Sequence, residues 1–360
     1  MELKLEHVAT GQVRIGQTQL RNLAHRILAA AGVEEEDARI VADSLVEADA
    51  RGMNSHGIIR LPVYVDRLLK GGVNARPNFL IVTESDSVTL CDAGDGLGAV
   101  ATRKAMEIAI EKAKRTGIAA TGVRNSNHNG EGARYVRQAT SANMIGVATT
   151  NSSPIMPAWG GRDPLVGPLP IAFGIPTDGE PIILDMALGM SSRGKILYYL
   201  EKGLELPSGW LVDAEGRPTT DPSWINKGGW ILPIGGHKGW GLILICEILS
   251  GILTGGAFGK ELTNLYERLD HPQRNGHLLI AIDIAKFVEL STFKRRVGEY
   301  MSLIKMSRLA PGFDEILVPG EIESRNFERQ QIEGITISRS VVEELLNLAS
   351  RLNIAVEEAA

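Results

Sequence analysis

The chain has 360 residues, of which 44% are hydrophobic and 22% are charged. These proportions are those of an ordinary globular protein, so the composition excludes a disordered chain and a fibrous repeat. The formal net charge is -5, with acidic and basic residues interspersed. This excludes a surface built to coat nucleic acid, and it predicts that a few local cations hold any anionic substrate.

The cysteine content and the apolar segments give a first indication of the compartment. Cys91 and Cys246 are far apart in apolar surroundings and fit no metal-binding or redox spacing, so we expect buried, reduced thiols. The N-terminus lacks the apolar run of a signal peptide, and the most apolar stretch, Leu242 to Leu253, is too short to span a bilayer. We therefore expect a cytoplasmic protein that contacts neither membrane nor nucleic acid and holds no metal.

The predicted elements, taken in chain order, mix helices and strands. Helical spacing of apolar residues predicts helices over residues 18–31, 34–50, 58–69, 99–115, 131–142, 239–251, 290–307 and 340–353. Short apolar runs predict strands over residues 79–83, 87–91, 118–123, 145–150, 172–175, 182–185 and 278–283, the first two as a hairpin. The expected fold class is α/β with helical ends.

Several common motifs are missing from the sequence. The nearest approach to a dinucleotide fingerprint is Gly94-Asp95-Gly96-Leu97-Gly98, whose glycine spacing is wrong for a Rossmann turn. There is no P-loop, no G-x-S-x-G elbow, no H-E-x-x-H and no paired Cys/His ligand set. The sequence thus gives no support for a hydrolase or a metalloenzyme.

The first of four polar segments that are candidates for the site contains His56 and Arg60, four residues apart. A helix would place both on one face. A guanidinium holds a carboxylate through two parallel hydrogen bonds, while a nearby histidine contacts the reacting oxygen. The alternative is a helix N-cap at Asn54 or Ser55, followed by a surface histidine and arginine.

The other three segments also allow two interpretations each. His128 follows a strand, where it would donate a proton to a carbonyl, or it belongs to an Asx-rich turn. Asp185 ends a strand, where it would orient a histidine, bind a ribose hydroxyl or cap the next helix. The glycines around Lys238 lead into a helix and suit an anion, or they form a plain loop-to-helix junction.

These segments, in this order, resemble the malate/L-lactate dehydrogenase family, which includes ureidoglycolate dehydrogenase, sulfolactate dehydrogenase, diketogulonate reductase and cyclic-imine reductases. The resemblance covers essentially the whole chain and rests on Ala48-Asp49-Ala50-Arg51-Gly52, Ser55-His56-Gly57, Arg60, Lys70-Gly71-Gly72-Val73-Asn74, Asn127-His128, Thr150-Asn151-Ser152, Trp159-Gly160-Gly161, Leu184-Asp185-Met186-Ala187, His237-Lys238-Gly239 and Leu249-Ser250-Gly251. Residues 218–222, 311–313 and 319–320 are most similar to ureidoglycolate dehydrogenase.

The resemblance implies a non-Rossmann fold like that of sulfolactate dehydrogenase, with a largely antiparallel sheet and helical N- and C-terminal parts, assembled as a homodimer. It implies a helical part over residues 1–75, a central α/β part over 76–124 with 251–310, an NAD(P)-binding domain over 125–250 and a C-terminal helical part over 311–360. The cofactor is expected to be NAD, with NADP as an alternative.

The resemblance also implies roles for individual residues. His128 matches the acid/base residue, His56 matches a histidine credited as proton donor in some members, and Asp185 belongs with them. Arg60, Ser152 and Tyr64 match substrate-binding positions. The cofactor-binding positions are Ile183, Leu184, Asp185, Met186, Ala187, His237, Lys238, Gly239, Gly320 and Glu321. The expected reaction converts a small 2-hydroxy acid of the malate, lactate or ureidoglycolate type into its 2-oxo acid.

One segment departs from the family pattern. Where many relatives read Gly-Thr-Asn-Pro, this chain has Gly167-Pro168-Leu169-Pro170. We expect the loss of two hydrogen-bonding side chains to disfavour substrates that need them. Two alternatives therefore stay open: a reductase of cyclic imines, and a relative that binds a metabolite without catalysis.

Overall fold

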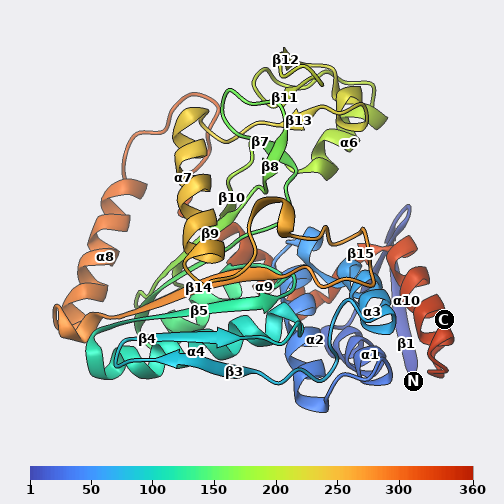
Figure 1. The fold of residues 1–360 in the computed structure, drawn as a ribbon, viewed down its shortest axis with the longest axis horizontal. Helices are drawn as coiled ribbons and strands as arrows, with labels where there is room; N and C mark the ends of the chain where they lie inside the picture. The colour runs from blue at the N-terminus through green and yellow to red at the C-terminus, as the bar shows by residue number, and fades with distance from the viewer. Residues whose placement is uncertain (360) are drawn as a thin grey trace.

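The centre of the fold is a seven-stranded sheet in the order β10-β9-β6-β14-β5-β4-β3, seen in a computed structural model that describes residues 1–359 (Figure 1). Every neighbouring pair is antiparallel except β4 and β5. The strands are β3 (Leu80–Glu84), β4 (Val88–Asp92), β5 (Ile118–Ser126), β6 (Met144–Thr150), β9 (Pro170–Ile175), β10 (Ile182–Ala187) and β14 (Asn275–Asp283). The predicted largely antiparallel sheet is confirmed, and so is the hairpin of β3 and β4.

Helices cover both faces of this sheet. α4 (Gly98–Thr116) and α5 (Ala133–Ser141) pack on one face, and α7 (His237–Glu247) with the π-helical turn η4 (Ile248–Ile252) packs on the other. The core under α4 and α5 is rich in alanine, with Ala105 and Ala109 on the helix side and Ala119, Ala148 and Ala281 on the sheet side. These small side chains let the helix and sheet backbones approach closely.

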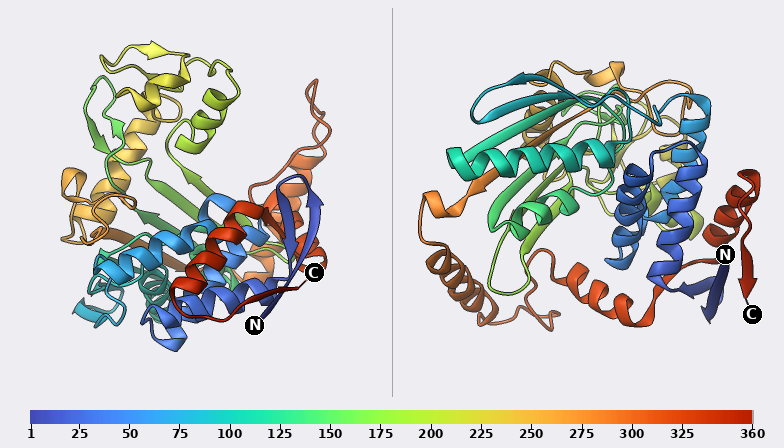
Figure 2. Two further views of the ribbon diagram at one scale, coloured as in Figure 1. Left: turned by 90° about the vertical axis from the view of Figure 1, so that its right-hand side faces the viewer. Right: turned by 90° about the horizontal axis from the view of Figure 1, so that it is seen from below.

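The two ends of the chain form a second body beside the sheet. It holds α1 (Gln17–Ala30), α2 (Glu35–Ala50), α3 (Leu61–Lys70), α9 (Glu321–Glu333) and α10 (Arg339–Arg351). A four-stranded sheet in the order β15-β2-β1-β16 joins them: β1 (Glu2–Ala9), β2 (Gln12–Ile15), β15 (Ile335–Ser338) and β16 (Glu357–Ala359). β1 pairs with β16 in parallel, so the termini lie side by side (Figure 2).

The rest of the chain between β6 and α7 forms a lobe above the sheet in Figure 1. It contains β7 (Met156–Pro157), β8 (Pro164–Val166), α6 (Arg193–Glu201), β11 (Leu211–Val212), β12 (Pro218–Thr219) and β13 (Trp230–Ile231). Its core includes Met156, Leu188, Leu211 and Ile243. Cys246 belongs to this core and Cys91 to the core under α4, and both are free and buried as predicted.

The sequence prediction missed or misplaced several elements. The strands β1, β2, β15 and β16 and the helices α6 and α9 were not expected. The helix predicted over 58–69 begins as a 3-10 turn, η2 (Ile58–Arg60), and another 3-10 turn, η1 (Asn54–His56), precedes it. The helix α8 (Leu290–Lys305) agrees with its prediction and buries no side chain. Within residues 1–359, no helix combines the length and apolar character needed to cross a membrane.

Candidate active site

The turn between α2 and α3 is held by a carboxylate inside the protein. Oδ2 of Asp49, on α2, accepts a hydrogen bond from the backbone N–H of Ile58 at 2.7 Å. A Cβ atom at Gly57 would lie 2.0 Å from Oδ1 of Asp49, so only glycine fits there. Arg60 closes the turn, because its Nε donates to the carbonyl oxygen of Ser55 at 2.7 Å. Asp49 therefore fixes the backbone that carries both His56 and Arg60.

His128 lies in the turn after β5, and a reciprocal amide pair fixes it. The backbone N–H of His128 donates to Oε1 of Gln273 at 3.0 Å, and the backbone N–H of Gln273 donates to Oδ1 of Asn127 at 3.1 Å. Gly98 passes close beneath this turn, since a Cβ atom there would lie 2.0 Å from the carbonyl oxygen of Asn127. Segments from three parts of the chain thus determine the backbone position of His128.

The structure brings four of the predicted residues together. The rings of His56 and His128 stack with centroids 5.7 Å apart and an interplanar angle of 20°. The hydroxyl of Tyr64 lies 2.6 Å from Nδ1 of His128. Arg60 is near enough for its charge to lower the pKa values of both histidines. This cluster favours the site interpretation of His56 and Arg60 over a surface histidine and arginine.

The hydrogen bonds at His128 determine its tautomer. The backbone N–H of Gly130 donates to Nδ1 at 3.4 Å, and an N–H group can only donate. Nδ1 is therefore an acceptor, the Tyr64 hydroxyl donates to it, and the neutral ring carries its hydrogen on Nε2. His128 consequently presents an N–H donor to any molecule placed beyond Nε2.

Burial keeps both histidines neutral. It lowers the pKa of His128 well below the usual value of a histidine, and repulsion from the Arg60 charge, and from His56 when that ring is protonated, lowers it further. Burial and the Arg60 charge lower the pKa of His56 to about 4. Arg60 stays cationic, and within residues 1–359 its two Nη atoms make no hydrogen bond. The site therefore combines two neutral imidazoles with one guanidinium whose Nη atoms have no hydrogen-bond partner in the described chain and whose Cζ lies 5.5 Å from the centre of the Tyr266 ring.

A buried charge network lies next to the cluster, and the sequence analysis did not predict it. Glu47 pairs with Arg51 at 3.1 Å, with Arg134 and, at 3.7 Å, with Arg137. Arg137 also pairs with Glu131 at 3.4 Å. Burial raises the pKa of Glu131 to about 7, although Arg137 opposes the shift. In the sequence these residues look like the ordinary polar side of helices, so no local signal identifies them.

Asp185 takes one of the roles that the sequence left open, the helix cap, and it also lines a cavity. Its Oδ2 accepts the backbone N–H of Ala133 at 2.7 Å and so caps the first turn of α5. Burial raises the pKa of Asp185. The residue also lines a cavity of about 370 Å³ together with Glu131, Arg137, Ile183, Leu184 and Gly320. No hydrogen bond joins Asp185 to a histidine among the described residues.

A second cavity, of about 340 Å³, shares Val318, Pro319 and Gly320 with the first. It is lined by Glu321, by α8 and by the turn between β9 and β10. Met186 and Ala187 continue β10 beyond Asp185. Of the predicted cofactor-binding residues, Ile183, Leu184, Asp185, Gly320 and Glu321 thus line two adjoining cavities.

The other predicted residues lie apart from the histidine pair. His237, Lys238 and Gly239 begin α7, and the ring of His237 meets the edge of Trp159 at 6.5 Å. Among the described residues, no hydrogen bond, ion pair or ring contact joins them to His56 or His128. Ser152 keeps a buried hydroxyl without a hydrogen-bond partner. Leu169, in the departing segment, is fully buried in the core of the upper lobe.

The raised pKa of Asp49 predicts a pH-dependent stability. Burial raises this pKa from 3.8 to about 7, with Glu131 adding to the shift and the Ile58 N–H opposing it. The folded state therefore retains a proton that the unfolded chain releases above pH 4, so stability falls as the pH rises toward 7. The Asp49→Asn variant keeps an acceptor and has no charge to bury. We expect its free energy of unfolding to gain about 2–3 kcal/mol relative to the parent between pH 5 and pH 8.

Chemical denaturation at several pH values measures this effect. Asp43→Asn is the matched control, because Asp43 lies on the same helix with 43% of its side chain exposed. Parallel pH profiles for the parent and Asp49→Asn would contradict the burial argument.

Comparison with known proteins places the chain in a family. The sequence profile described as malate/L-lactate dehydrogenase matches residues 15–346. The malate dehydrogenase of Pyrococcus abyssi is 41% identical over 355 residues, covering 97% of both chains. The ureidoglycolate dehydrogenase (NAD(+)) of Escherichia coli K12 is 33% identical over 336 residues, covering 93% of this chain and 95% of that protein. The solved sulfolactate dehydrogenase of Methanocaldococcus jannaschii superimposes with a TM-score of 0.90 at 40% identity, covering 94% of this chain and 97% of the other. The chain belongs to the malate/L-lactate dehydrogenase family.

Proposed function

We propose that the chain is an NAD(P)-dependent dehydrogenase that interconverts a small 2-hydroxy acid and its 2-oxo acid, with His128 as the acid/base residue. The observation that carries this proposal is the Nε2–H of His128, which is fixed by two donors at Nδ1 and lies in one cluster with the unpaired fork of Arg60. A carbonyl beside a carboxylate suits such a donor and such a fork.

The cavities beside Asp185 fit a nicotinamide dinucleotide. Each has a volume at the lower end of the range for small-molecule sites, and Val318, Pro319 and Gly320 line both. Ile182, Ile183 and Val318 supply apolar wall for flat rings, and Asp185 and Glu131 supply polar edges. When bound, the cofactor supplies or accepts the hydride. Residues 125–250 as the NAD(P)-binding domain, and the other domain boundaries, remain proposals.

Arg60, His128 and His56 bind the substrate and move the proton. Arg60 binds the substrate carboxylate and sets the orientation of the carbonyl. The Nε2–H of His128 donates to the carbonyl oxygen and transfers its proton as negative charge develops there. His56, stacked on His128 and held by Ser55 at 2.9 Å, forms one side of the pocket.

A neutral imidazole that loses the Nε2 proton must gain one at Nδ1. The Tyr64 hydroxyl already donates to Nδ1 and is placed to supply that proton, after which the phenolate is left near Arg60. Burial raises the pKa of Tyr64 well above its usual value, and the Arg60 charge opposes this shift. Proton transfer from Tyr64 through His128 to the substrate oxygen leaves a tyrosinate and a hydrogen on Nδ1 of His128. A solvent proton taken up at Nε2, with return of the Nδ1 proton to Tyr64, restores the starting state.

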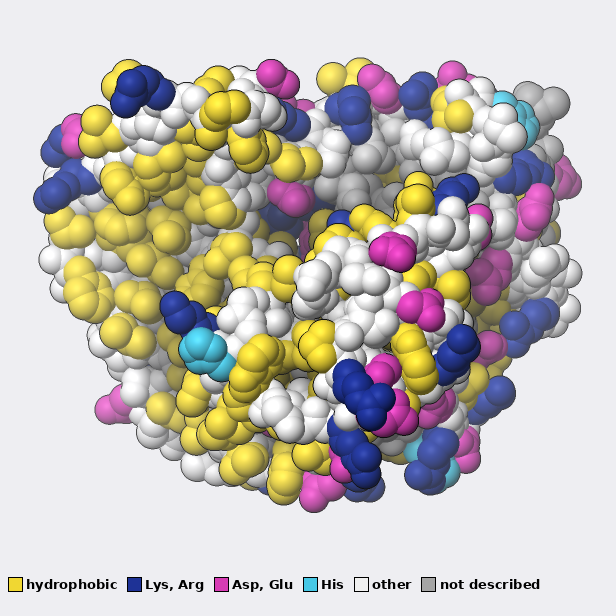
Figure 3. All heavy atoms as spheres, turned by 90° about the horizontal axis from the view of Figure 1, so that it is seen from above, with side chains coloured by type: hydrophobic (Ala, Val, Ile, Leu, Met, Phe, Trp, Pro, Cys, Tyr) yellow, Lys and Arg dark blue, Asp and Glu magenta, His cyan; other side chains and the backbone are white. Residues whose placement is uncertain are grey.

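A homodimer is the assembly that the exposed surface supports. Leu242, Leu244, Ile245, Ile252 and Leu253 on α7 and η4 each leave 43–62% of their area exposed, and Figure 3 shows hydrophobic side chains gathered on the side of the molecule that carries α7. A helix that is apolar on all sides is normally buried, and an apolar patch of this kind marks a protein contact. We propose a second copy of the chain as the partner.

The assay that tests the function follows NADH and NADPH oxidation with a panel of 2-oxo acids and cyclic imines. The panel contains pyruvate, oxaloacetate, a 3-sulfo analogue and piperideine-2-carboxylate, with ureidoglycolate run in the oxidative direction. Turnover of a 2-oxo acid supports the proposal, turnover of imines alone would replace it with an imine reductase, and binding without turnover of any compound would replace it with a metabolite-binding role.

His128→Asn and Tyr64→Phe separate the chemical step from binding. We expect kcat to fall at least about 100-fold in His128→Asn and about 10-fold in Tyr64→Phe. The NADH dissociation constant should stay near the parent value in both variants, because neither side chain lines either of the two cavities. Tyr199→Phe, in the core of the upper lobe, is the control for loss of a tyrosine hydroxyl. Equal losses of turnover and NADH binding would make His128 a structural residue.

Arg60→Lys tests the carboxylate contact. A lysine keeps the charge and loses the two-pronged hydrogen bond, so we expect KM for the 2-oxo acid to rise about 10- to 100-fold while kcat changes less. Arg103→Lys, at an exposed ion pair on α4, controls for the substitution itself. An unchanged KM would remove Arg60 from the substrate site.

Ile245→Glu tests the assembly. A charge in the centre of the patch should shift the protein from dimer to monomer in sedimentation experiments, because an unpaired carboxylate would have to be buried at the interface. Glu299→Gln, at an exposed ion pair with Arg295 on α8, provides the control. A parent protein that sediments as a monomer would rule out the homodimer.

A further inference from the structure

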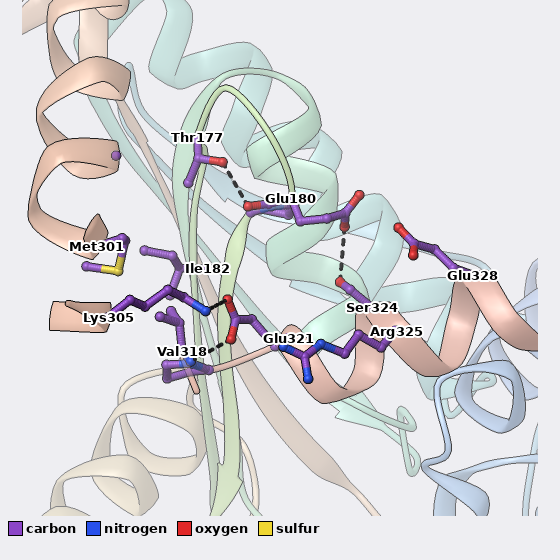
Figure 4. A pocket seen from close by; sticks show the side chains of 14 residues that line it. Thr177, Glu180, Ile182, Met301, Lys305, Val318, Glu321, Ser324, Arg325 and Glu328 are labelled. Carbon is purple, nitrogen blue, oxygen red and sulfur yellow. Dashed lines mark hydrogen bonds and ion pairs between the residues drawn. The ribbon is translucent and has the colours of Figure 1, made fainter. Parts of the chain in front are cut away.

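The guanidinium of Arg60 has different partners from the cations that line the two cavities. Lys305, for example, is paired with Glu321 in the cavity beside α8 (Figure 4). Among the described residues no carboxylate pairs with Arg60, whose Nε donates to the carbonyl oxygen of Ser55. Its Cζ lies over the ring of Tyr266, 5.5 Å from the ring centre. The Arg60 side chain is thus held by a carbonyl at Nε and by an aromatic ring over its planar group.

Tyr266 belongs to a loop over residues 263–273, which we call the Tyr266 loop. The backbone N–H of Thr263 donates to the carbonyl oxygen of Gln273 at 3.2 Å and closes the base of this loop. The side chain of Gln273 also accepts the backbone N–H of His128 at 3.0 Å. The base of the loop therefore holds the backbone of the proposed proton donor, while Tyr266 contacts the proposed carboxylate ligand.

A buried arginine holds the Tyr266 loop in place. The side chain of Arg67, on α3, is fully buried. Its Nη atoms donate to four backbone carbonyl oxygens of the loop, at 3.3 to 3.5 Å for the first three of Asn264, Leu265, Glu267 and His271. Withdrawal of the loop would leave a charge inside the protein without these acceptors, which is strongly unfavourable. The burial of Arg67 therefore fixes the loop against α3.

Close packing at the end of α3 adds to this constraint. A Cβ atom at Gly72 would lie 2.1 Å from the carbonyl oxygen of Leu269, so glycine lets the loop backbone approach the helix end. The same helix begins directly after Arg60 and carries Tyr64, whose hydroxyl binds Nδ1 of His128. One helix and one loop, locked together, thus hold both Arg60 and His128.

We propose that Tyr266 is a positioning residue for Arg60, and that its ring directs the guanidinium fork toward the substrate carboxylate. The proposal rests on the proposed function, because it takes Arg60 as the carboxylate ligand. The ring face attracts the cation and the Ser55 carbonyl holds Nε, so the edge formed by the two Nη atoms is left for a ligand. Without the ring, part of the binding free energy would be lost to ordering the Arg60 side chain.

Tyr266→Leu and Tyr266→Phe test the proposal in kinetics at saturating NADH. Leucine keeps an apolar side chain and removes the ring, so we expect KM for the 2-oxo acid to rise about 3- to 5-fold. The kcat and the NADH dissociation constant should stay near the parent values. Phenylalanine keeps the ring face and should keep the parent KM. Tyr300→Leu is the matched control, because Tyr300 on α8 has 61% of its area exposed, as Tyr266 has.

A double-mutant cycle with Arg60→Lys separates positioning of Arg60 from a direct contact between the ring and the substrate. A lysine has no planar fork to orient, so Tyr266→Leu should change KM less than about 2-fold in that background. The full effect in the Arg60→Lys background, an unchanged KM in Tyr266→Leu, or an equal rise in Tyr266→Phe overturns this inference and leaves the dehydrogenase intact. A parent that neither turns over a 2-oxo acid nor binds oxamate, an unreactive 2-oxo acid analogue, overturns the proposed function and this inference together.

Discussion

Nδ1 of His128 accepts hydrogen bonds from two groups that reach it from different directions. The Gly130 N–H comes from the turn that carries His128 itself, and the Tyr64 hydroxyl comes from α3, in the helical body formed by the chain ends. The Gly130 N–H fixes the tautomer from within the turn, and the docked helical body adds the Tyr64 hydroxyl as a second donor. Asp49, Gly57 and Gln273 contribute to the same result, because they fix the backbone of the two turns that meet there. Docking of the helical body thus completes the hydrogen bonding at Nδ1 of His128.

Much of the fold could be predicted from periodicity, and the failures have physical causes. The helices around the central sheet are amphipathic over several turns, which is the pattern that single-sequence reasoning detects. β1 and β2 have exposed polar residues within a short run, and what stabilises them is pairing with β15 and β16 from the other end of the chain. α9 buries only Gln330, so it has no apolar stripe to detect. Contacts across more than 300 residues leave no local signature.

The site could be predicted as a set of residues but not as a geometry. Spacing suggested that His56 and Arg60 share a helix face, whereas Asp49 takes the Ile58 N–H and splits the segment into two 3-10 turns. The two residues still meet, through the Ser55 carbonyl that Arg60 binds. The ion pairs of Glu47 with Arg134 and Arg137 are invisible in the sequence, because each residue alone looks like a solvated helix position. Leu169, in the segment that departs from the family pattern, belongs to the core of the upper lobe.

Burial disfavours the charged form of each titratable group of the site. It disfavours the charged forms of His56 and His128, and it raises the pKa values of Asp49 and Glu131 to about 7. Arginine cannot release its proton in a protein, so Arg60 is the group in the histidine cluster whose charge burial does not remove. The unfavourable solvation of that guanidinium is relieved when a carboxylate enters. The chain has a net charge of -5 and therefore repels an anionic substrate overall. The positive charge of Arg60 opposes this repulsion at the site. The same dry environment that makes His128 neutral therefore also makes Arg60 a strong carboxylate site, and both properties follow from enclosing the turn after β5 between the sheet and the helical body.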